Sequence, residues 1–540
     1  MAKKLRVVLA QLNFKVGDIE GNLQKHIEAA KAARDTHQAD IIVFPELSIT
    51  GYPPEDLLLR PSFIQAANEG VNSFKSQIEG IHCVVGHPYP NSQGLFNSCS
   101  LIYNGTILGR YNKQALPNYS VFDEYRYFTP GTLPCVVPIH GVPVGLLICE
   151  DLWRPGPTHQ AAIQGARLIL SPNASPFETD KQERRFNTLV KRTKTANAPI
   201  VYVNCVGGQD ELVFDGGSMV VDQTGKLCHH AGFCNETLSV LDIEISSTEA
   251  KIALDSFSLP DIEKRTYDCI VMSVRDYIHK NNFKGAIVGV SGGIDSALTL
   301  AIAVDALGKE NVTAVYMPSH FNAPISGEDA KQLASNLGVE YQVISIEPSY
   351  TTFLQSLAPS FAGKKPDVTE ENIQSRCRGL ILMALSNKSG RIVLITGNRS
   401  ELAVGYTTIY GDMAGGFAVL KDVPKTFVYR LARYRNQINP VIPERTIQRP
   451  PTAELAPDQK DEDTLPPYST LDNILELYLN QQQGTDEIIA QGYDPATVEK
   501  IVHLIKKSEY KRRQAPVGPR INHENFGHGW RYPITSGFKG

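Results

Sequence analysis

Short apolar runs alternate with amphipathic stretches through the first 245 residues of the chain. The apolar runs have the length and composition of buried strands, which predicts strands over residues 6–12, 41–44, 82–86, 98–103, 142–149, 168–171, 200–205 and 218–221. Apolar residues at helical spacing predict helices over 22–36, 160–166 and 186–196. Buried strands separated by helices are typical of a layered α/β domain, so we expect one here.

The second half of the chain repeats this alternation of strands and helices. Strands are predicted over residues 286–290, 312–317, 340–346 and 392–396, and helices over 267–281, from 295, and over 326–337, 373–387, 471–481 and 495–507. The βαβ order predicts a doubly wound parallel sheet, in which ligands bind at the carboxyl ends of the strands. Two polar segments, 291–296 and 396–398, lie at such ends.

The length of 540 residues exceeds what one hydrophobic core normally supports, so two or three domains are expected. We predict a domain over residues 1–250, a linker poor in apolar residues over 251–264, and a domain over 265–540. Residues 443–468 are rich in proline and charge and lack periodicity. A loop of this length favours a segment that closes over substrate, and an exposed tether is the alternative.

Composition excludes several classes of protein. A formal net charge of −4 argues against a surface that coats nucleic acid. The nine cysteines are odd in number and contain no C-x-x-C pair, which favours a reducing, cytoplasmic setting over a disulfide framework. The apolar run near the N-terminus is short and interrupted by Gln11 and Asn13, and no run is long enough to span a membrane.

The most informative turn is Ser-Gly-Gly-Ile-Asp-Ser, residues 291–296, between a predicted strand and a predicted helix. Such a turn aims unpaired backbone N–H groups at one spot, which suits an anion, and glycines let a phosphate approach. Asp295 is placed to hold a metal ion on the phosphates. An ordinary Gly-Gly turn is the alternative, and the accompanying serines and aspartate favour phosphate binding. The Walker pattern is excluded because no lysine follows the glycines.

This SGGxDS turn resembles the pyrophosphate loop of the ATP pyrophosphatase family, whose members cleave ATP between the α- and β-phosphates. The resemblance implies that ATP is a substrate. It assigns ATP binding to the strand end and the turn, namely Gly289, Val290, Ser291, Gly292, Gly293, Ile294, Asp295 and Ser296.

In the first half, three polar or reactive residues end apolar runs or lie in loops: Glu46, Lys113 and Cys149. Each alone would be interpreted as a solvated charge or a small buried thiol. Together, FPELSITGYPPEDLL, YNKQALPNYSVFDEYRYFTPG and ICEDLW resemble, in this order, the three motif regions of the nitrilase superfamily. That resemblance implies a Glu-Lys-Cys catalytic triad.

The chemistry of amide hydrolysis explains these residue types. A thiolate from Cys149 would attack the carboxamide carbon, and Glu46 would act as general base. The Lys113 ammonium would stabilise the oxyanion. The glutamine-hydrolysing branch of the superfamily has substrate-binding positions that match Tyr119, Ser175 and Lys181. A packing tyrosine and a surface lysine are the alternatives for Tyr119 and Lys181.

The second half carries further motifs: ENIQSR, TGNRSE, GYTTIYGDMAGGFAVLKDV and SEYKRRQAP. They resemble the NAD synthetase family motif by motif. The resemblance implies that Asn372, Glu401 and Lys511 contact deamido-NAD, and that Thr396 contacts ATP. It also implies Mg²⁺ binding by Asp295 and Glu401. Each residue has a structural alternative. Asn372 could cap a helix, and Thr396 could be a hydroxyl at a strand end. Glu401 could be an acid in the first turn of a helix, and Lys511 a solvated cation.

The two resemblances together imply a nitrilase-like αββα layered domain followed by a Rossmann-like, adenine nucleotide α-hydrolase domain. The implied reaction adenylates the carboxylate of deamido-NAD with MgATP and then forms the amide with ammonia from glutamine. A sheltered passage would keep that ammonia unprotonated. A homo-oligomer without nucleic-acid or membrane partners is expected. Another ATP-cleaving amidotransferase, an RNA-modifying enzyme and a nucleotide sensor without catalysis are the alternatives.

Overall fold

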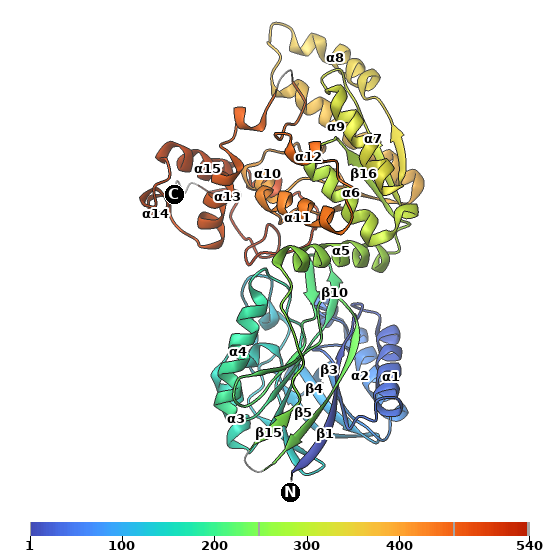
Figure 1. Cartoon of the computed structure of the whole chain (residues 1–540), viewed down its shortest axis with the longest axis vertical. Helices are drawn as coiled ribbons and strands as arrows, with labels where there is room; N and C mark the ends of the chain where they lie inside the picture. The colour runs from blue at the N-terminus through green and yellow to red at the C-terminus, as the bar shows by residue number, and fades with distance from the viewer. Residues whose placement is uncertain (1, 247–248, 457–458, 537–540) are drawn as a thin grey trace. The chain divides into compact units, whose positions relative to one another are not determined.

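The computed structural model describes residues 2–246, 249–456 and 459–536, and the chain divides into two compact units, Met1–Pro260 and Asp261–Gly540 (Figure 1). The predicted linker, residues 251–264, contains regular structure at both ends. Strand β15 (Ala250–Ile252) still belongs to the first unit, and helix α5 (Ile262–Lys280) opens the second. Each unit is described by itself below.

The first unit is built from two β-sheets and four main helices. The seven-stranded sheet has the order β15-β14-β1-β2-β3-β4-β5, and the six-stranded sheet has the order β13-β12-β9-β8-β7-β6. The first sheet comprises β1 (Lys3–Gln11), β2 (Ile41–Val43), β3 (His82–Asn91), β4 (Gly94–Tyr103), β5 (Thr106–Asn112), β14 (Thr237–Ile245) and β15. The second comprises β6 (Cys135–Ile139), β7 (Val142–Leu146), β8 (Leu168–Asn173), β9 (Ile200–Asn204), β12 (Met219–Val221) and β13 (Leu227–His230). Strands β10 (Val206–Gln209) and β11 (Leu212–Asp215) form a separate hairpin.

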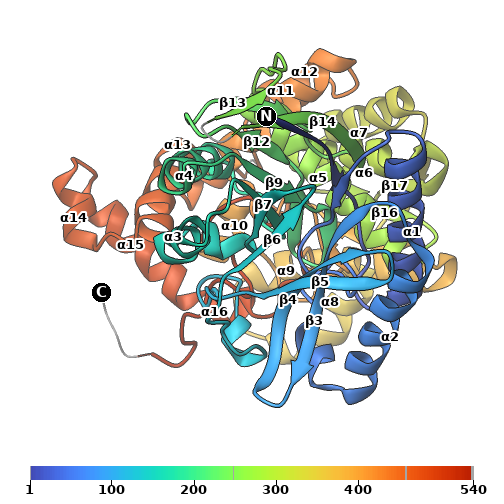
Figure 2. The ribbon, with the colours of Figure 1, turned by 90° about the horizontal axis from the view of Figure 1, so that it is seen from below.

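Two apolar cores give this unit its layers. Residues of both sheets, among them Leu101 and Val144, share one core. A second core lies between the seven-stranded sheet and helices α1 (Ile19–Asp35) and α2 (Pro61–Gln77), where Phe44 meets Phe74. Helices α3 (Pro155–Ile163) and α4 (Lys181–Ala196) cover the opposite side, next to the six-stranded sheet (Figure 2). The αββα arrangement predicted from the sequence is therefore confirmed.

The second unit contains a five-stranded parallel sheet of order β18-β17-β16-β19-β20. Its strands are β16 (Ala286–Val290), β17 (Val312–Tyr316), β18 (Glu340–Val343), β19 (Ile392–Ile395) and β20 (Phe417–Ala418). From β16 the chain first adds β17 and β18 on one side of the sheet, and it then adds β19 and β20 on the other side of β16. The strand order therefore reverses between β16 and β19. A crevice at such a switch point is the usual ligand site of a doubly wound sheet, and this fold class is confirmed.

Helices surround this sheet and extend beyond it. They are α5, α6 (Ile294–Leu307), α7 (Pro324–Leu337), α8 (Glu347–Phe361), α9 (Val368–Ser389), α10 (Arg399–Val404), α11 (Lys425–Ile438), α12 (Glu444–Gln448), α13 (Tyr468–Leu475), α14 (Thr485–Ala490), α15 (Pro495–Lys507) and α16 (Glu509–Arg512). Helices α10, α13, α14 and α15 share a separate apolar core that includes Leu471 and Ile501.

Among the differences between the sequence-based expectations and the structure, three concern segments that carry candidate site residues. The strand predicted to reach Cys149 ends at Leu146, because the chain must turn sharply to present Cys149. Residues 443–468 are not wholly irregular: they include α12 and a 3₁₀ turn, η5 (Asp461–Asp463). Strand β5, which leads directly into Lys113, has too few apolar positions to show in the pattern.

Candidate active sites

Cys149 lies on a strained turn in the first unit. It is the first residue of the 3₁₀ turn η3 (Cys149–Leu152), three residues after strand β7 ends at Leu146. Its φ of +43° is in the left-handed region. A β-region residue at this position would point its side chain elsewhere, so the strain serves to present the thiol. The side chain is buried, with 7% exposure.

The carboxylate of Asp151 holds this turn in place. It accepts hydrogen bonds from the backbone N–H groups of Ile148 at 3.0 Å and Ala115 at 2.8 Å, and from the Tyr111 hydroxyl at 3.0 Å. Burial raises the pKa of Asp151 to about 6, and the hydrogen bonds oppose this rise. Asp151 therefore ties the Cys149 turn to the segment after Lys113.

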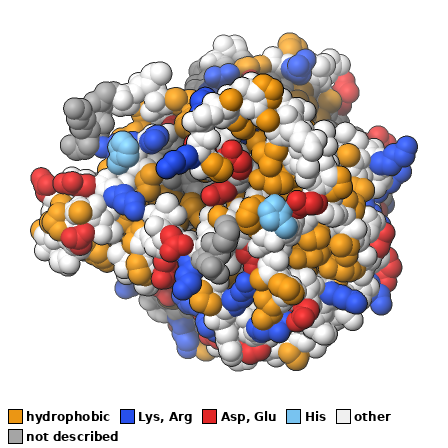
Figure 3. All heavy atoms as spheres, turned by 90° about the horizontal axis from the view of Figure 1, so that it is seen from above, with side chains coloured by type: hydrophobic (Ala, Val, Ile, Leu, Met, Phe, Trp, Pro, Cys, Tyr) orange, Lys and Arg blue, Asp and Glu red, His pale blue; other side chains and the backbone are white. Residues whose placement is uncertain are grey.

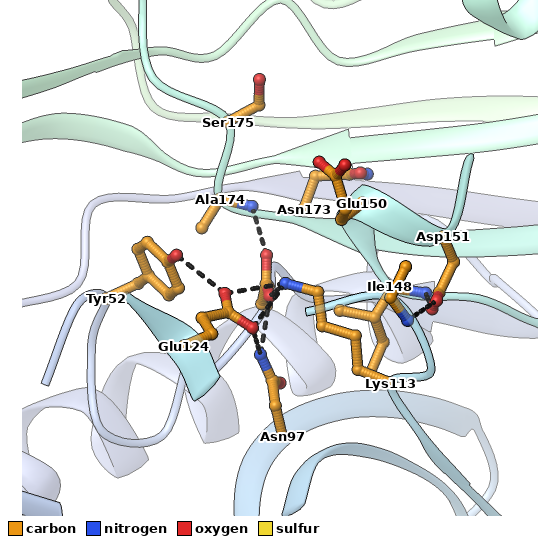
Figure 4. A network of polar contacts seen from close by, with 12 residues as sticks. Tyr52, Asn97, Lys113, Glu124, Ile148, Glu150, Asp151, Asn173, Ala174 and Ser175 are labelled. Atoms are coloured by element: carbon orange, nitrogen blue, oxygen red, sulfur yellow. Dashed lines mark hydrogen bonds and ion pairs between the residues drawn. The ribbon is translucent and has the colours of Figure 1, made fainter. Parts of the chain in front are cut away.

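A lysine and two glutamates share one buried network beside this turn (Figure 4). Lys113 Nζ lies 2.6 Å from Glu46 Oε1, and 2.8 and 2.9 Å from the two carboxylate oxygens of Glu124. Asn97 Nδ2 donates to Glu46 Oε1 at 2.7 Å, and the Ala174 N–H donates to Glu46 Oε2 at 3.0 Å. The predicted residues Glu46 and Lys113 are thus brought together, each just beyond a strand of the seven-stranded sheet.

Electrostatics set the resting protonation of this network. Burial alone would lower the pKa of Lys113, but Glu124 and Glu46 together raise it well above its usual value, so its ammonium is retained. Burial raises the pKa of the Cys149 thiol, with a further contribution from Glu46. The thiol is therefore protonated at rest, and a base is needed to form the thiolate.

Glu124 is a site residue that the sequence analysis did not single out. It begins a 3₁₀ turn (Glu124–Arg126), it is 5% exposed, and Tyr52 donates to its Oε1 at 2.9 Å. Burial raises its pKa, and Lys113 opposes this shift. Its position inside the quoted Lys113 motif was available, but a lone glutamate in a polar loop carries no pattern that marks it as buried.

The three predicted glutamine-binding residues lie in different surroundings. Tyr119 is 41% exposed and its hydroxyl donates to Glu150 Oε2 at 2.9 Å. Ser175 is buried, and its Oγ accepts a hydrogen bond from Arg185 at 3.1 Å. Lys181 begins helix α4, 3.5 Å from Glu178 and over the ring of Trp153. Glu150, directly after Cys149, links Tyr119 to the Cys149 turn.

In the second unit, the predicted ATP residues line one cavity of about 300 Å³. They are Gly289, Val290, Ser291, Gly292, Gly293, Ile294, Asp295, Ser296 and Thr396. The cavity lies at the carboxyl ends of β16 and β19, which is the switch point of the sheet. Backbone N–H groups at the start of α6 face it, and an anion is the ligand that such a helix start favours.

The shape of the turn depends on Gly292. Its φ is +84°, and a Cβ there would lie 2.4 Å from the Ser326 carbonyl oxygen. Ser296 Oγ accepts from the Ser291 N–H at 3.2 Å and donates to the Gly293 carbonyl at 3.0 Å. Ser291 Oγ also accepts from the Gly293 N–H at 3.2 Å, so the two serines fix the turn internally.

The two predicted Mg²⁺ ligands meet around a lysine that the sequence analysis did not assign. Lys425 Nζ contacts Asp295 Oδ2 and lies 3.2 Å from Glu401 Oε1. Asn398 Nδ2 also donates to Asp295 Oδ1 at 2.9 Å. Mg²⁺ commonly uses one or two protein carboxylates together with substrate phosphates and water, so a pair that converges on one cation beside a phosphate-type turn fits this ion.

Two predicted deamido-NAD residues, Asn372 and Lys511, form hydrogen bonds with the loop at residues 405–408. Asn372 Oδ1 accepts from Thr408 Oγ1 at 2.7 Å, and Lys511 Nζ donates to the Gly405 and Thr407 carbonyls at 2.7 Å each. Neither lines the large cavity, whereas Glu401 does. A second hollow of about 270 Å³ shares lining residues with the cavity and adds Arg376 and Tyr410.

The segment predicted to close over substrate does line the cavity, at 449–455 and at Asp461. Glu454 anchors it: its carboxylate accepts from Ser326 Oγ at 2.6 Å and from Asn322 Nδ2 at 3.0 Å. Gln374 donates to the Leu455 carbonyl at 3.0 Å. In this structure the segment is therefore fastened to α7 and α9 at the edge of the cavity.

The fold and these sites define a class: a nitrilase-type carbon–nitrogen hydrolase joined to a nucleotide-binding synthetase. The family model described as carbon-nitrogen hydrolase matches residues 6–253, and the one described as NAD synthase matches residues 266–515. The glutamine-dependent NAD(+) synthetases of Xanthomonas campestris and Aquifex aeolicus are 47% and 45% identical, with at least 99% of each chain covered. The chain belongs to the glutamine-dependent NAD(+) synthetase family, and it is an enzyme of the ligase type.

Solved structures agree with this assignment. The glutamine-dependent NAD+ synthetase of Acinetobacter baumannii, solved in complex with adenosine diphosphate, is 44% identical over 98% of both chains, with a TM-score of 0.81. A glutamine-dependent NAD(+) synthetase from Cytophaga hutchinsonii has a TM-score of 0.83 at 22% identity, so it supports the fold alone. The predicted family is confirmed.

Proposed function

We propose that this chain makes NAD⁺ by ATP-dependent amidation of deamido-NAD, with glutamine as the nitrogen source and AMP, pyrophosphate and glutamate as the other products. The proposal rests mainly on the similarity to glutamine-dependent NAD(+) synthetases, which extends over essentially the whole of both chains. The polar groups that each half-reaction needs also converge within the corresponding unit, which supports the proposal.

In the first unit, glutamine would be hydrolysed through a thioester on Cys149. Glu46 takes the thiol proton, the thiolate sulfur attacks the carboxamide carbon, and Lys113 stabilises the oxyanion. The proton held by Glu46 passes to the leaving ammonia, and Glu46 then deprotonates the water that cleaves the thioester. The contacts of Lys113 with both glutamates support these roles, because they hold an ammonium and a base beside the thiol.

The entrance to this site suits the charged end of glutamine. Tyr119, Ser175 and Lys181 are proposed to bind it, and Glu150 adds a buried carboxylate within reach of the Tyr119 hydroxyl. The Glu150 carboxylate and the Lys181 ammonium are groups of opposite charge that match the α-ammonium and α-carboxylate of an amino acid.

In the second unit, the turn over residues 291–296 would bind the ATP phosphates through its backbone N–H groups, and Thr396 would contact the nucleotide. Asp295 and Glu401 would hold Mg²⁺, which supplies charge neutralisation for the pyrophosphate that leaves. A carboxylate oxygen of deamido-NAD attacks the α-phosphorus and the bond to pyrophosphate breaks. Ammonia then attacks the adenylated carbon, loses a proton and displaces AMP.

Deamido-NAD is proposed to extend from the cavity toward the second hollow. Asn372, Glu401 and Lys511 are the predicted contacts. Asn372 and Lys511 bond the Thr407–Thr408 segment, so they also hold the loop at residues 405–408. This loop is therefore placed to sense whether the acceptor nucleotide is bound.

The remaining partners are proposed to be small molecules and further copies of this chain. Among the described residues, no helix is long and apolar enough to cross a bilayer. On the face in Figure 3, basic side chains lie among acidic ones rather than in one basic field, which argues against nucleic acid. Leu380 on α9 is 63% exposed and the nearby Tyr410 is 71% exposed, which favours a homo-oligomer. A cytoplasmic location is proposed, and sedimentation of Leu380→Glu would test the oligomer.

The decisive experiment incubates the full chain with deamido-NAD, MgATP and glutamine and measures NAD⁺ and pyrophosphate. We expect both products from the wild type. Cys149→Ala should make NAD⁺ only when ammonium replaces glutamine, because its thiol acts only in the first unit. No NAD⁺ from either nitrogen source would overturn the proposal and leave an amidotransferase with another acceptor.

A further inference from the structure

Lys425 has an unusual environment for a lysine in this cavity. It is the first residue of α11 and is 2% exposed, and its ammonium lies between the carboxylates of Asp295 on α6 and Glu401 on α10. Its backbone N–H donates to Ser400 Oγ at 2.9 Å, and its ammonium lies 5.2 Å from the centre of the Tyr468 ring. The side chain is therefore fixed at both ends.

The two carboxylates need a cation at this point. They come from different helices and meet in a place where water reaches little of either side chain. Two uncompensated carboxylates in such a site would repel each other and lose hydration. The Lys425 ammonium, which contacts a carboxylate oxygen of each, supplies the compensating positive charge.

The carboxylates of Asp295 and Glu401 are also the proposed Mg²⁺ ligands. The Lys425 ammonium and Mg²⁺ would therefore compete for the same position between them. Mg²⁺ demands regular octahedral geometry with short ligand distances, which an ammonium between the same oxygens prevents. The ammonium must therefore move before both carboxylates reach the metal. The cavity offers it a destination, because Lys425 and the phosphate-type turn line the same space.

We propose that Lys425 is a positioning residue whose ammonium holds the carboxylates of Asp295 and Glu401 together. Mg²⁺ replaces this ammonium only when nucleotide is present. This inference rests on the proposed function, since it uses the proposed metal ligands. Without nucleotide, a metal ion would have to displace the Lys425 ammonium while that ammonium gains no new partner, so the metal ion binds weakly. With nucleotide bound, the displaced ammonium gains phosphate oxygens, so nucleotide and metal bind cooperatively.

The test measures binding of Mn²⁺, as a paramagnetic substitute for Mg²⁺, to the full chain with and without a non-hydrolysable ATP analogue. We expect the wild type to bind Mn²⁺ weakly without nucleotide and at least tenfold more tightly with it. Lys425→Met removes the charge but keeps similar length, so it should bind Mn²⁺ at least tenfold more tightly than the wild type without nucleotide. Equal affinities of the two proteins without nucleotide would overturn the proposal.

Matched variants keep this result interpretable. Lys421→Met removes another lysine that lines the cavity, but Lys421 donates to the Pro516 carbonyl at 2.7 Å instead of bridging the acids, so its Mn²⁺ affinity should match the wild type. Lys425→Arg keeps a cation and should also bind Mn²⁺ weakly without nucleotide. If Lys425→Met does not fold, tight Mn²⁺ binding by Lys425→Arg or by the nucleotide-free wild type overturns the proposal.

The failure of this inference is distinguishable from failure of the proposed function. NAD⁺ formation by the wild type from ammonium and MgATP is measured in parallel. NAD⁺ formation without the difference in Mn²⁺ affinity overturns only the role of Lys425. Absence of NAD⁺ formation overturns the assignment of the reaction itself.

Discussion

Lys113 is bonded by two carboxylates, and this pairing sets how Cys149 can react. A single glutamate would have to balance the ammonium and also accept the thiol proton. With Glu124 bonded to Lys113 through both oxygens, Glu46 keeps one oxygen directed to the Ala174 N–H, on the side of the thiol. In the proposed mechanism, Glu124 would therefore balance the charge of Lys113 and leave Glu46 to accept the thiol proton.

Glu124→Gln should therefore slow glutamine hydrolysis. The amide keeps the shape but removes the negative charge, so Lys113 shifts toward Glu46 and its ammonium is less well aimed at the oxyanion. We expect kcat for glutaminase activity to fall on the order of 10²-fold. NAD⁺ formation from added ammonium should stay near the wild-type rate in the same preparation, and a wild-type glutaminase rate would contradict this role.

Glu150→Gln should change substrate preference at the same site. If Glu150 contacts the α-ammonium, its neutralisation should raise KM for glutamine by about tenfold to a hundredfold, as expected for a charge-assisted hydrogen bond. KM for glutaramate, which lacks the α-amino group, should not change. A parallel rise for both substrates would indicate that Glu150 acts only on the structure of the turn.

At the scale of elements, both sites use the end of a strand followed by a sharp turn. Cys149 follows β7 with a φ of +43°, and Gly292 follows β16 with a φ of +84°. Both turns expose backbone N–H groups that a continued strand or helix would pair. A strand end is rigid because its neighbours hold it, so the reacting group is fixed even though the turn itself is short.

Gly292→Ala tests the second turn. The added methyl group would meet the Ser326 backbone at 2.4 Å in a left-handed conformation, which costs roughly 1–3 kcal/mol. We expect KM for ATP to rise and NAD⁺ formation from ammonium to be largely lost. Gly156→Ala is the control, because it lies in the first unit, where an added methyl group would meet nothing within 4 Å, and it should leave both quantities near the wild-type values.

At the scale of the whole molecule, chemistry and stability are divided between two units with separate cores. The first unit also buries neutral histidines. His26 is fully buried, its Nδ1 lies 2.7 Å from the Asn22 carbonyl oxygen and its Nε2 lies 2.8 Å from Ser48 Oγ. Burial lowers the pKa of His26 to about 4, and burial lowers that of His87 to about 4 as well.

These histidines should make the chain sensitive to acid. Below pH 6.5 the unfolded chain binds a proton at His26, whereas the folded chain does so only near pH 4, so the free energy of unfolding falls as pH decreases through this window. Between pH 7 and pH 4 it should fall by about 3 kcal/mol more in the wild type than in His26→Gln. Denaturant titrations at several pH values measure this, and parallel pH profiles of the two proteins would contradict it.

The sequence by itself determined the two fold classes, the strands β2 and β16 that precede Glu46 and the 291–296 turn, and the glycine turn at 291–296. Apolar periodicity indicates directly which positions are buried. The turn at residues 291–296 is recognisable because its glycines, serines and aspartate occur together between a predicted strand and a predicted helix. Cys149, Glu46 and Lys113 were singled out by the resemblance of their three motif regions, because each alone would be interpreted as a solvated charge or a small buried thiol.

Only the tertiary structure decided which charges meet. Glu124 and Lys425 lie in polar segments of the sequence and Glu150 directly follows an apolar run, and an isolated charge at any of these places is usually solvated. Their burial depends on strands and helices that are distant in the chain: Glu124 meets Glu46 through Lys113, and Lys425 meets Asp295, 130 residues away, at the start of another helix. Charge pairing acts through space, and no periodic pattern along the chain records it.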